Sequence, residues 1–346
     1  MGVLNTDKIS PIFITGTYRS GSTLTARLLD NHSELSVWAD TVHFFRYCYQ
    51  RYDPISDFSN VEKLVGDVAD RLRLRFGMEA PVSEILNTLH ETETTYASVY
   101  NAIYSSSYFL DGKKRWGEKT VLAWTRTEDF LKMFPSGKVI LTVRDPRAVL
   151  VSWKRETIAR KPLYMDAVFN CLGALQEGRR LKATLDKNSF YILKLEETLS
   201  NPEATVKLLC KFLDVDFEAG ILDTSKFSDT KTVKARTNPT FSERNRNCRG
   251  FIIDTIKSWK AQINKEELLI CNRILSEELT SYGYQEMCDD KATDGLLERY
   301  FSRTDDYLFR HYIEWKETGL GHEGYPTDPT NPHNWDPKSS KWELRK

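Results

Sequence analysis

The stretch that decides the fold is FITGTYRSGSTLTARLLD, residues 13–30. Gly16 and Gly21 have the spacing of the two glycines in the nucleotide-binding loop G-x-x-x-x-G-K-[ST], and Thr23 stands where that pattern ends. Ser22 occupies the position of the lysine that binds phosphate in this pattern. A positively charged side chain, Arg19, lies three residues earlier. The stretch therefore predicts a phosphate-binding loop that lacks the usual lysine.

Such a loop would hold an anion mainly through its backbone. Residues 11–15 are an apolar run typical of a buried strand, and residues 21–30 place leucines on one helical face. At the start of a helix the backbone N–H groups point outward and the helix dipole favours negative charge. The predicted contacts are the guanidinium of Arg19 and the N–H groups or hydroxyls of Ser20, Gly21, Ser22, Thr23 and Leu24. No aspartate suited to hold Mg²⁺ follows a strand, which predicts one phosphate here and no metal.

Strand and helix patterns alternate along the chain. Further strands are predicted at ELSVWAD (34–40), KVILTV (138–143) and FYILKLEE (190–197), and helices begin near Pro146 and Pro202. Residues 61–110 look mostly helical and carry a tyrosine every fourth position from 96 to 108, a stripe more typical of packing than of a ligand pocket. We therefore predict an α/β fold, P-loop-like, with three αβα layers and a central parallel sheet.

A second anion site is predicted after the strand 138–143. In VRDPRAVLVSW (143–153), Arg144 closes the strand and Ser152 lies in the second turn of the next helix. Both can reach one anion at the carboxyl edge of the sheet, where open α/β sheets bind ligands. One loop for a 5′-phosphate and a second pair for another phosphate describe a nucleotide that is phosphorylated at both ends.

The paired motifs resemble those of the sulfotransferase superfamily that uses 3′-phosphoadenosine-5′-phosphosulfate (PAPS), in particular its bacterial and tyrosylprotein-type members. TYRSGSTL (17–24) is similar to the family's 5′-phosphosulfate loop, and VRDPRAVLVSW to its 3′-phosphate motif. WGEKTV (116–121) and the strand–helix segment 190–215 also resemble the family. CRGFIIDTIKSWK (248–260) resembles the segment that closes over the 3′-phosphate, which places Arg249 and Gly250 there. The likeness covers roughly residues 10–285.

The resemblance implies a metal-independent, in-line transfer of SO₃ from PAPS to an acceptor, with release of adenosine 3′,5′-bisphosphate (PAP). Arg19 and Lys119 would stabilise charge on the departing phosphate. Asp40 occupies the position at which some members of the family carry a catalytic carboxylate, so it is a candidate for the base that deprotonates the acceptor. His43, three residues later, is the alternative candidate. We favour Asp40, and we take Glu118 to be structural.

The resemblance also sets the expected domain boundaries. Residues 1–290 would form a sulfotransferase domain with a helical insertion at about 45–112. Residues 291–346 would form a C-terminal extension, helical and then rich in Gly and Pro, that packs on or near the acceptor side.

Composition limits the choice of partners. Lys+Arg and Asp+Glu both number 49, which argues against broad nucleic-acid or membrane-surface binding. We see no secretion signal and no apolar run long enough to span a membrane, and we expect a cytoplasmic enzyme with a small-molecule acceptor such as a natural product. The acceptor, the choice of O- or N-sulfation and the oligomeric state stay undetermined.

Two other functions compete. A P-loop kinase or NTPase would share the first loop, although the replaced lysine and the pair Arg144 and Ser152 argue against it. A non-catalytic nucleotide-binding protein on the same fold is the second alternative. The retained cations Arg19, Lys119 and Arg144 make it the weaker one.

Overall fold

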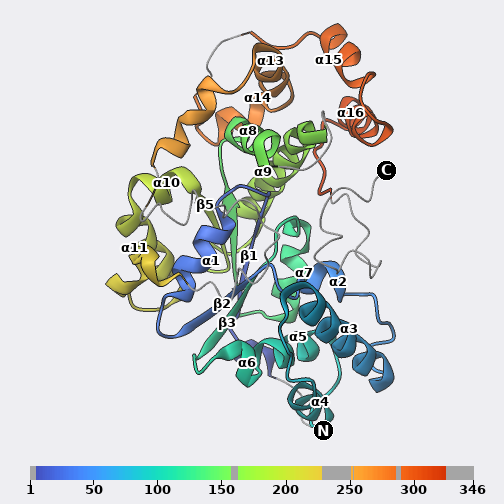
Figure 1. Cartoon of the computed structure of the whole chain (residues 1–346), viewed down its shortest axis with the longest axis vertical. Helices are drawn as coiled ribbons and strands as arrows, with labels where there is room; N and C mark the ends of the chain where they lie inside the picture. The colour runs from blue at the N-terminus through green and yellow to red at the C-terminus, as the bar shows by residue number, and fades with distance from the viewer. Residues whose placement is uncertain (1–4, 157–162, 228–250, 252, 286–289, 325–346) are drawn as a thin grey trace.

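The computed structural model describes residues 5–156, 163–227, 251, 253–285 and 290–324 (Figure 1). Its centre is a parallel five-stranded sheet with the strand order β2-β3-β1-β4-β5. The strands are β1 Ile12–Gly16, β2 Leu35–Ala39, β3 Arg115–Lys119, β4 Lys138–Val143 and β5 Phe190–Lys194. The predicted α/β fold with a central parallel sheet is confirmed.

Helices follow the strands and pack on both faces of the sheet (Figure 1). Between β1 and β3 lie α1 Ser22–Asp30, α2 Phe44–Tyr47, α3 Phe58–Phe76, α4 Val82–His90, α5 Tyr96–Ser105 and α6 Ser107–Leu110. Between β3 and β5 lie α7 Thr127–Met133, α8 Pro146–Glu156 and α9 Asp166–Thr184. After β5 come α10 Leu195–Ser200, α11 Pro202–Leu213, α13 Lys265–Ile274, α14 Ser276–Ser281, α15 Asp294–Phe301 and α16 Asp306–Thr318.

Alternating side chains of the strands build two separate cores. In β1, Ile12 and Ile14 pack with α1 and α11 on one face of the sheet. Phe13, between them, points to the other face and joins the large cluster formed with α2–α7 and α9. This alternation, two residues per repeat in a strand, produces the three layers that the sequence predicts.

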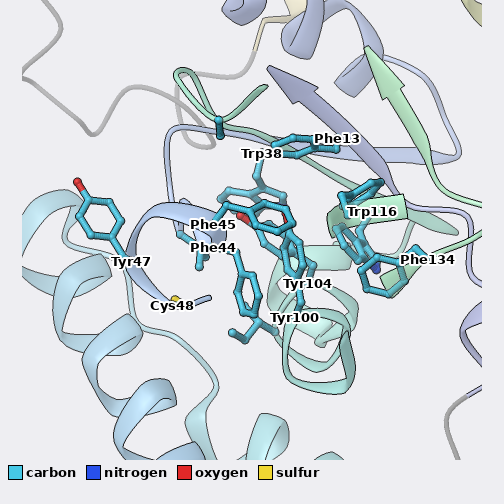
Figure 2. Close-up of a cluster of buried hydrophobic side chains, with 14 of the residues drawn as sticks. Phe13, Trp38, Phe44, Phe45, Tyr47, Cys48, Tyr100, Tyr104, Trp116 and Phe134 are labelled. Atoms are coloured by element: carbon cyan, nitrogen blue, oxygen red, sulfur yellow. The ribbon is translucent and has the colours of Figure 1, made fainter. Parts of the chain in front are cut away.

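The tyrosine stripe is part of the second core. Tyr100 stacks on Phe44 with ring centroids 4.0 Å apart, and Tyr104 stacks on Trp116 at 5.1 Å. Figure 2 shows these rings gathered between α5, α2 and the sheet. The stripe spans two helices, because α5 ends at Ser105 and Tyr108 belongs to α6. Both Tyr100 and Tyr104 are fully buried, so this part of the stripe is packing, as expected.

Successive strands of the sheet are added first on one side of β1 and then on the other. From β1 it runs outward to β2 and returns through β3, whereas β4 and β5 lie on the other side of β1. The carboxyl ends of β1 and β4 therefore form a topological switch point, the usual place for a ligand in an open α/β sheet. Among the residues described here, no helix is both long and apolar enough to cross a membrane.

Candidate functional site

The first predicted phosphate loop connects β1 to α1 at the switch point. Gly16 has φ +147°, and a Cβ there would lie 2.3 Å from the carbonyl oxygen of Thr142, so only glycine lets β1 approach β4 this closely. Gly21 has φ +95° at the N-cap of α1, where no side chain caps the helix. The first N–H groups of α1 therefore have no side-chain cap from residue 21, as the predicted anion site requires.

Ser20 has a structural role in this loop. Its side chain is fully buried, and its hydroxyl donates to the carbonyl oxygen of Thr17 at 2.7 Å and lies 2.8 Å from Oγ1 of Thr142. These contacts tie the loop to β4. They engage the hydroxyl of Ser20, and phosphate binding by Ser22, Thr23 and the first turn of α1 stays a prediction.

The glycine at position 21 is open to a direct test. We expect Gly21→Ala to lower the free energy of unfolding by about 3 kcal/mol, because its φ is strained for alanine and the new Cβ would lie 2.6 Å from Cδ1 of Leu195. Gly77→Ala is the matched control, with φ +64° and no atom within 4 Å of the new Cβ, and should cost only about 1 kcal/mol. Urea denaturation measures both; equal losses would mean that the contact with Leu195 relaxes freely.

The structure brings the two predicted anion loops into direct contact. Nε of Arg19 donates to Oγ of Ser152 at 2.8 Å, across 133 residues of sequence. Nη1 of Arg144 donates to the backbone oxygen of Arg19 at 3.3 Å. The guanidinium of Arg144 therefore faces the first loop, as the hypothesis of two adjacent anion sites requires.

Arg144 is a buried cation held by backbone oxygens. Besides Arg19, its guanidinium donates through Nη2 to the carbonyl oxygen of Thr255 at 2.9 Å. Burial lowers the pKa of Arg144, while Glu196 and Asp145 nearby act in the opposite direction. An arginine remains protonated at neutral pH in spite of such a shift, so this edge of the sheet carries a desolvated positive charge.

The late segment predicted to cover the second phosphate reaches the site through Thr255. Arg249 and Gly250, the two residues proposed there, lie outside the described residues, so their role stays a prediction. Thr255 itself was not among the predicted residues. It contributes a backbone oxygen, and no side-chain pattern in the sequence could have revealed it.

A second cluster lies at the ends of β2 and β3. Nζ of Lys119 contacts both carboxylate oxygens of Asp40, at 2.8 and 2.7 Å. The parallel register that pairs Ala39 with Lys119 brings the end of β3 beside the residue that follows β2. Nε2 of His43 lies 3.7 Å from Oδ1 of Asp40. The structure thus joins three of the four predicted catalytic residues, Asp40, His43 and Lys119, in one group, whereas the fourth, Arg19, contacts Ser152.

The backbone of this cluster is strained. Asp40 has φ +58° and His43 has φ +51°, values that non-glycine residues rarely adopt. Arg19, in the first loop, has φ +71°. Strained residues of this kind persist where the surrounding structure holds them, and they concentrate at functional sites.

Glu118 holds the cluster in place from the other face of the sheet. It is fully buried, and it accepts hydrogen bonds from Tyr100 Oη and from the N–H of Phe44, the latter at 3.2 Å. Burial raises the pKa of Glu118, and the hydrogen bonds from Tyr100, Tyr104 and Phe44 oppose that effect. Because Phe44 begins α2 directly after His43, Glu118 positions His43 and has the structural role expected of it.

Comparison with known proteins identifies the family. The model of the family described as "Sulfotransferase family" matches residues 11–219, well over half of the chain. The chain belongs to the sulfotransferase family. A search of curated proteins finds no significant match for this sulfotransferase.

Two solved sulfotransferase domains share the fold. The sulfotransferase domain from the curacin biosynthetic pathway has 18% identity and a TM-score of 0.57, with 80% of this chain and 98% of that chain covered. The sulfotransferase domain from the olefin synthase of Synechococcus PCC 7002 has 15% identity and a TM-score of 0.56, with 82% and 99% covered. The predicted membership in the sulfotransferase superfamily and its αβα fold are thereby confirmed.

In this sulfotransferase the C-terminal segment reaches the loop after β3. The carboxylate of Glu323 accepts hydrogen bonds from the N–H and the hydroxyl of Thr125, both at 3.0 Å. Burial raises the pKa of Glu323, and the hydrogen bonds from Thr125, together with the charge of Arg46 on α2, oppose this effect. Neither Glu323 nor Arg46 was singled out in the sequence, because neither belongs to a recognisable motif.

Proposed function

We propose that this chain transfers a sulfuryl group from PAPS to a hydroxyl or amine of a small-molecule acceptor, without a metal, and releases PAP. The observation that carries the proposal is the contact of Arg19 with Ser152 and Arg144. It joins, at neighbouring strand ends, the two loops that would bind the phosphates. A nucleotide with one phosphate group at each end of its ribose would use both loops.

PAPS supplies the sulfuryl group and an adenosine bisphosphate as leaving group. On the protein side, the N–H groups at the start of α1 and the guanidinium of Arg19 would bind the 5′-phosphate. Arg144 and Ser152 would bind the 3′-phosphate. Lys119 lies at the next strand end, where its ammonium would stabilise charge on the leaving oxygen.

We infer that Asp40 is the base and that His43 positions it. The Asp40 side chain is 31% exposed, whereas that of His43 is 7% exposed, so the carboxylate is the group better able to meet an acceptor. Lys119 contacts both oxygens of this carboxylate and keeps it oriented. Accepting a proton from the acceptor would weaken this ion pair and free the ammonium of Lys119 for the leaving phosphate.

Binding of PAP tests the assignment of the second loop. We expect Arg144→Gln to weaken PAP binding by about 50-fold, because a charge-assisted contact to the 3′-phosphate is lost. Binding of 5′-AMP, which lacks that phosphate, should change less than about threefold. Isothermal titration calorimetry measures both ligands.

The matched control is Arg179→Gln, which removes an exposed arginine paired with Glu277 on the surface. It should leave both affinities unchanged. Equal losses for PAP and AMP in Arg144→Gln would show that Arg144 only supports the Arg19 loop. Unchanged PAP affinity would remove Arg144 from the site.

The two competing functions give different results in simple assays. A P-loop kinase or NTPase would turn over ATP with Mg²⁺, and a sulfotransferase would not. A non-catalytic nucleotide-binding protein would bind PAP but would neither hydrolyse labelled PAPS slowly nor transfer its sulfuryl group to any member of a broad acceptor panel.

A further inference from the structure

The last described segment, Gly319–Gly324, is fastened to α9. Its backbone N–H groups donate to three acceptors on that helix: Phe169 O at 3.2 Å, Gln176 Oε1 at 2.9 Å and Asn170 Oδ1 at 3.0 Å. A Cβ on Gly173 would lie 2.8 Å from the carbonyl oxygen of His322, so the backbones pack without a side chain between them. This docking gives His322 a defined place beside the start of α9.

His322 meets two other metal-binding side chains there. One ligand atom each from Asp166, His311 and His322 lies within 4.8 Å of the others. Nε2 of His322 is 2.7 Å from Oδ1 of Asp166, and the two imidazole rings lie parallel with centroids 3.6 Å apart. The three residues come from α9, α16 and the C-terminal segment, so the tertiary structure alone brings them together.

Outer partners orient two of these side chains, Asp166 and His311. Oδ2 of Asp166 accepts hydrogen bonds from Nδ2 of Asn170 at 3.0 Å and from Oη of Tyr307 at 3.3 Å, which turns Oδ1 toward His322. Nδ1 of His311 lies 3.0 Å from the carboxylate of Glu314, which leaves Nε2 to face the cluster. Contacts of histidine to a carboxylate, and of a carboxylate to hydrogen-bond donors, are the usual outer shell of a metal site.

We propose that Asp166, His311 and His322 bind a Zn²⁺ ion that fastens the C-terminal segment to α9 and α16. Two imidazoles and one carboxylate form a donor set that suits Zn²⁺, whereas Mg²⁺ and Ca²⁺ prefer oxygen ligands alone. Both histidines also line a cavity of about 230 Å³, which leaves room for water as the fourth ligand. Binding replaces the direct contact between His322 Nε2 and Asp166 Oδ1 and turns the stacked rings, so that a nitrogen of each points at one ion.

This site is independent of the proposed sulfuryl transfer, because its effect is on the stability of the C-terminal segment. Its test uses the full-length, tag-free chain after treatment with a chelator. Titration calorimetry with ZnSO₄ should show one Zn²⁺ per chain, bound with micromolar or tighter affinity. Excess Zn²⁺ should raise the Tm by roughly 4 °C. Co²⁺ should produce the visible absorption bands of a tetrahedral site.

Substitutions of the proposed ligands and of one outer partner test where the Zn²⁺ ion binds. His311→Asn and His322→Asn should each weaken Zn²⁺ binding by about 100-fold or more and abolish the rise in Tm, and Tyr307→Phe should weaken it by about tenfold through the outer shell. His90→Asn, an exposed histidine on α4, is the control and should change nothing.

Wild-type protein that binds neither ion would overturn the proposal, and so would affinity that survives both histidine substitutions. The Co²⁺ spectrum needs only the wild-type chain, so it remains decisive even if a variant does not fold.

Discussion

Replacing Lys119 by methionine should lower kcat for sulfuryl transfer by about 10²–10³-fold, while PAP affinity changes less than tenfold. The reason is the position of its ammonium. Nζ is almost fully buried at the end of β3, where its charge is worth more than in water, and both of its short contacts go to Asp40. Methionine keeps the length and the apolar stem of the side chain and removes the charge.

Single-turnover kinetics with labelled PAPS separates the loss of chemistry from a loss of binding. Lys194→Met is the matched control, because Lys194 also ends a strand of this sheet but donates to the carbonyl oxygen of Tyr282, away from Asp40. Its kcat should remain within a few-fold of the wild-type value. A Lys119→Met enzyme that turns over at the wild-type rate would remove Lys119 from the mechanism.

The second large effect concerns the base. Asp40→Asn should reduce kcat by about 10³-fold, and His43→Gln by only about tenfold, because we assign proton transfer to the carboxylate and a positioning role to the imidazole. Asparagine keeps the shape and can still contact Lys119, so a loss of activity would reflect the lost proton acceptor.

The pH dependence of kcat/KM distinguishes the two residues independently of the size of the effect. The rise in rate with pH, which follows deprotonation of the base, should disappear in Asp40→Asn and persist in His43→Gln. The reverse pattern would make His43 the base and Asp40 its positioning partner, since the two side chains already lie 3.7 Å apart.

Local sequence patterns predicted much of the sheet. The apolar run KVILTV coincides with β4, and the pair Asp145 and Pro146 marks the start of α8, where the Asp145 carboxylate accepts the N–H of Arg147 at 3.0 Å. These features depend on neighbouring residues only, because apolar runs, proline and an N-cap act over one or two turns.

Strand β3 was not predicted as a strand, although its segment was singled out by resemblance. Its sequence, RWGEK, is mostly polar and contains glycine, so no apolar run or alternation marks it. Its burial depends on partners elsewhere in the chain: the tyrosines of α5 for Glu118, and Asp40 for Lys119. Polar residues can occupy a buried strand when distant residues satisfy their hydrogen bonds.

The sequence by itself determined four of the five strands and offered candidate anion-binding residues, because helix starts, strand runs and glycine loops are properties of short segments. Only the tertiary structure decided which of those residues meet. It placed Arg19 on Ser152, Arg144 on the backbone of Arg19, and Lys119 on Asp40, through the order and register of parallel strands. It also gathered Asp166, His311 and His322 from three separate elements. The physical reason is that contacts between distant segments depend on how helices and strands pack, and no short stretch of sequence encodes that packing.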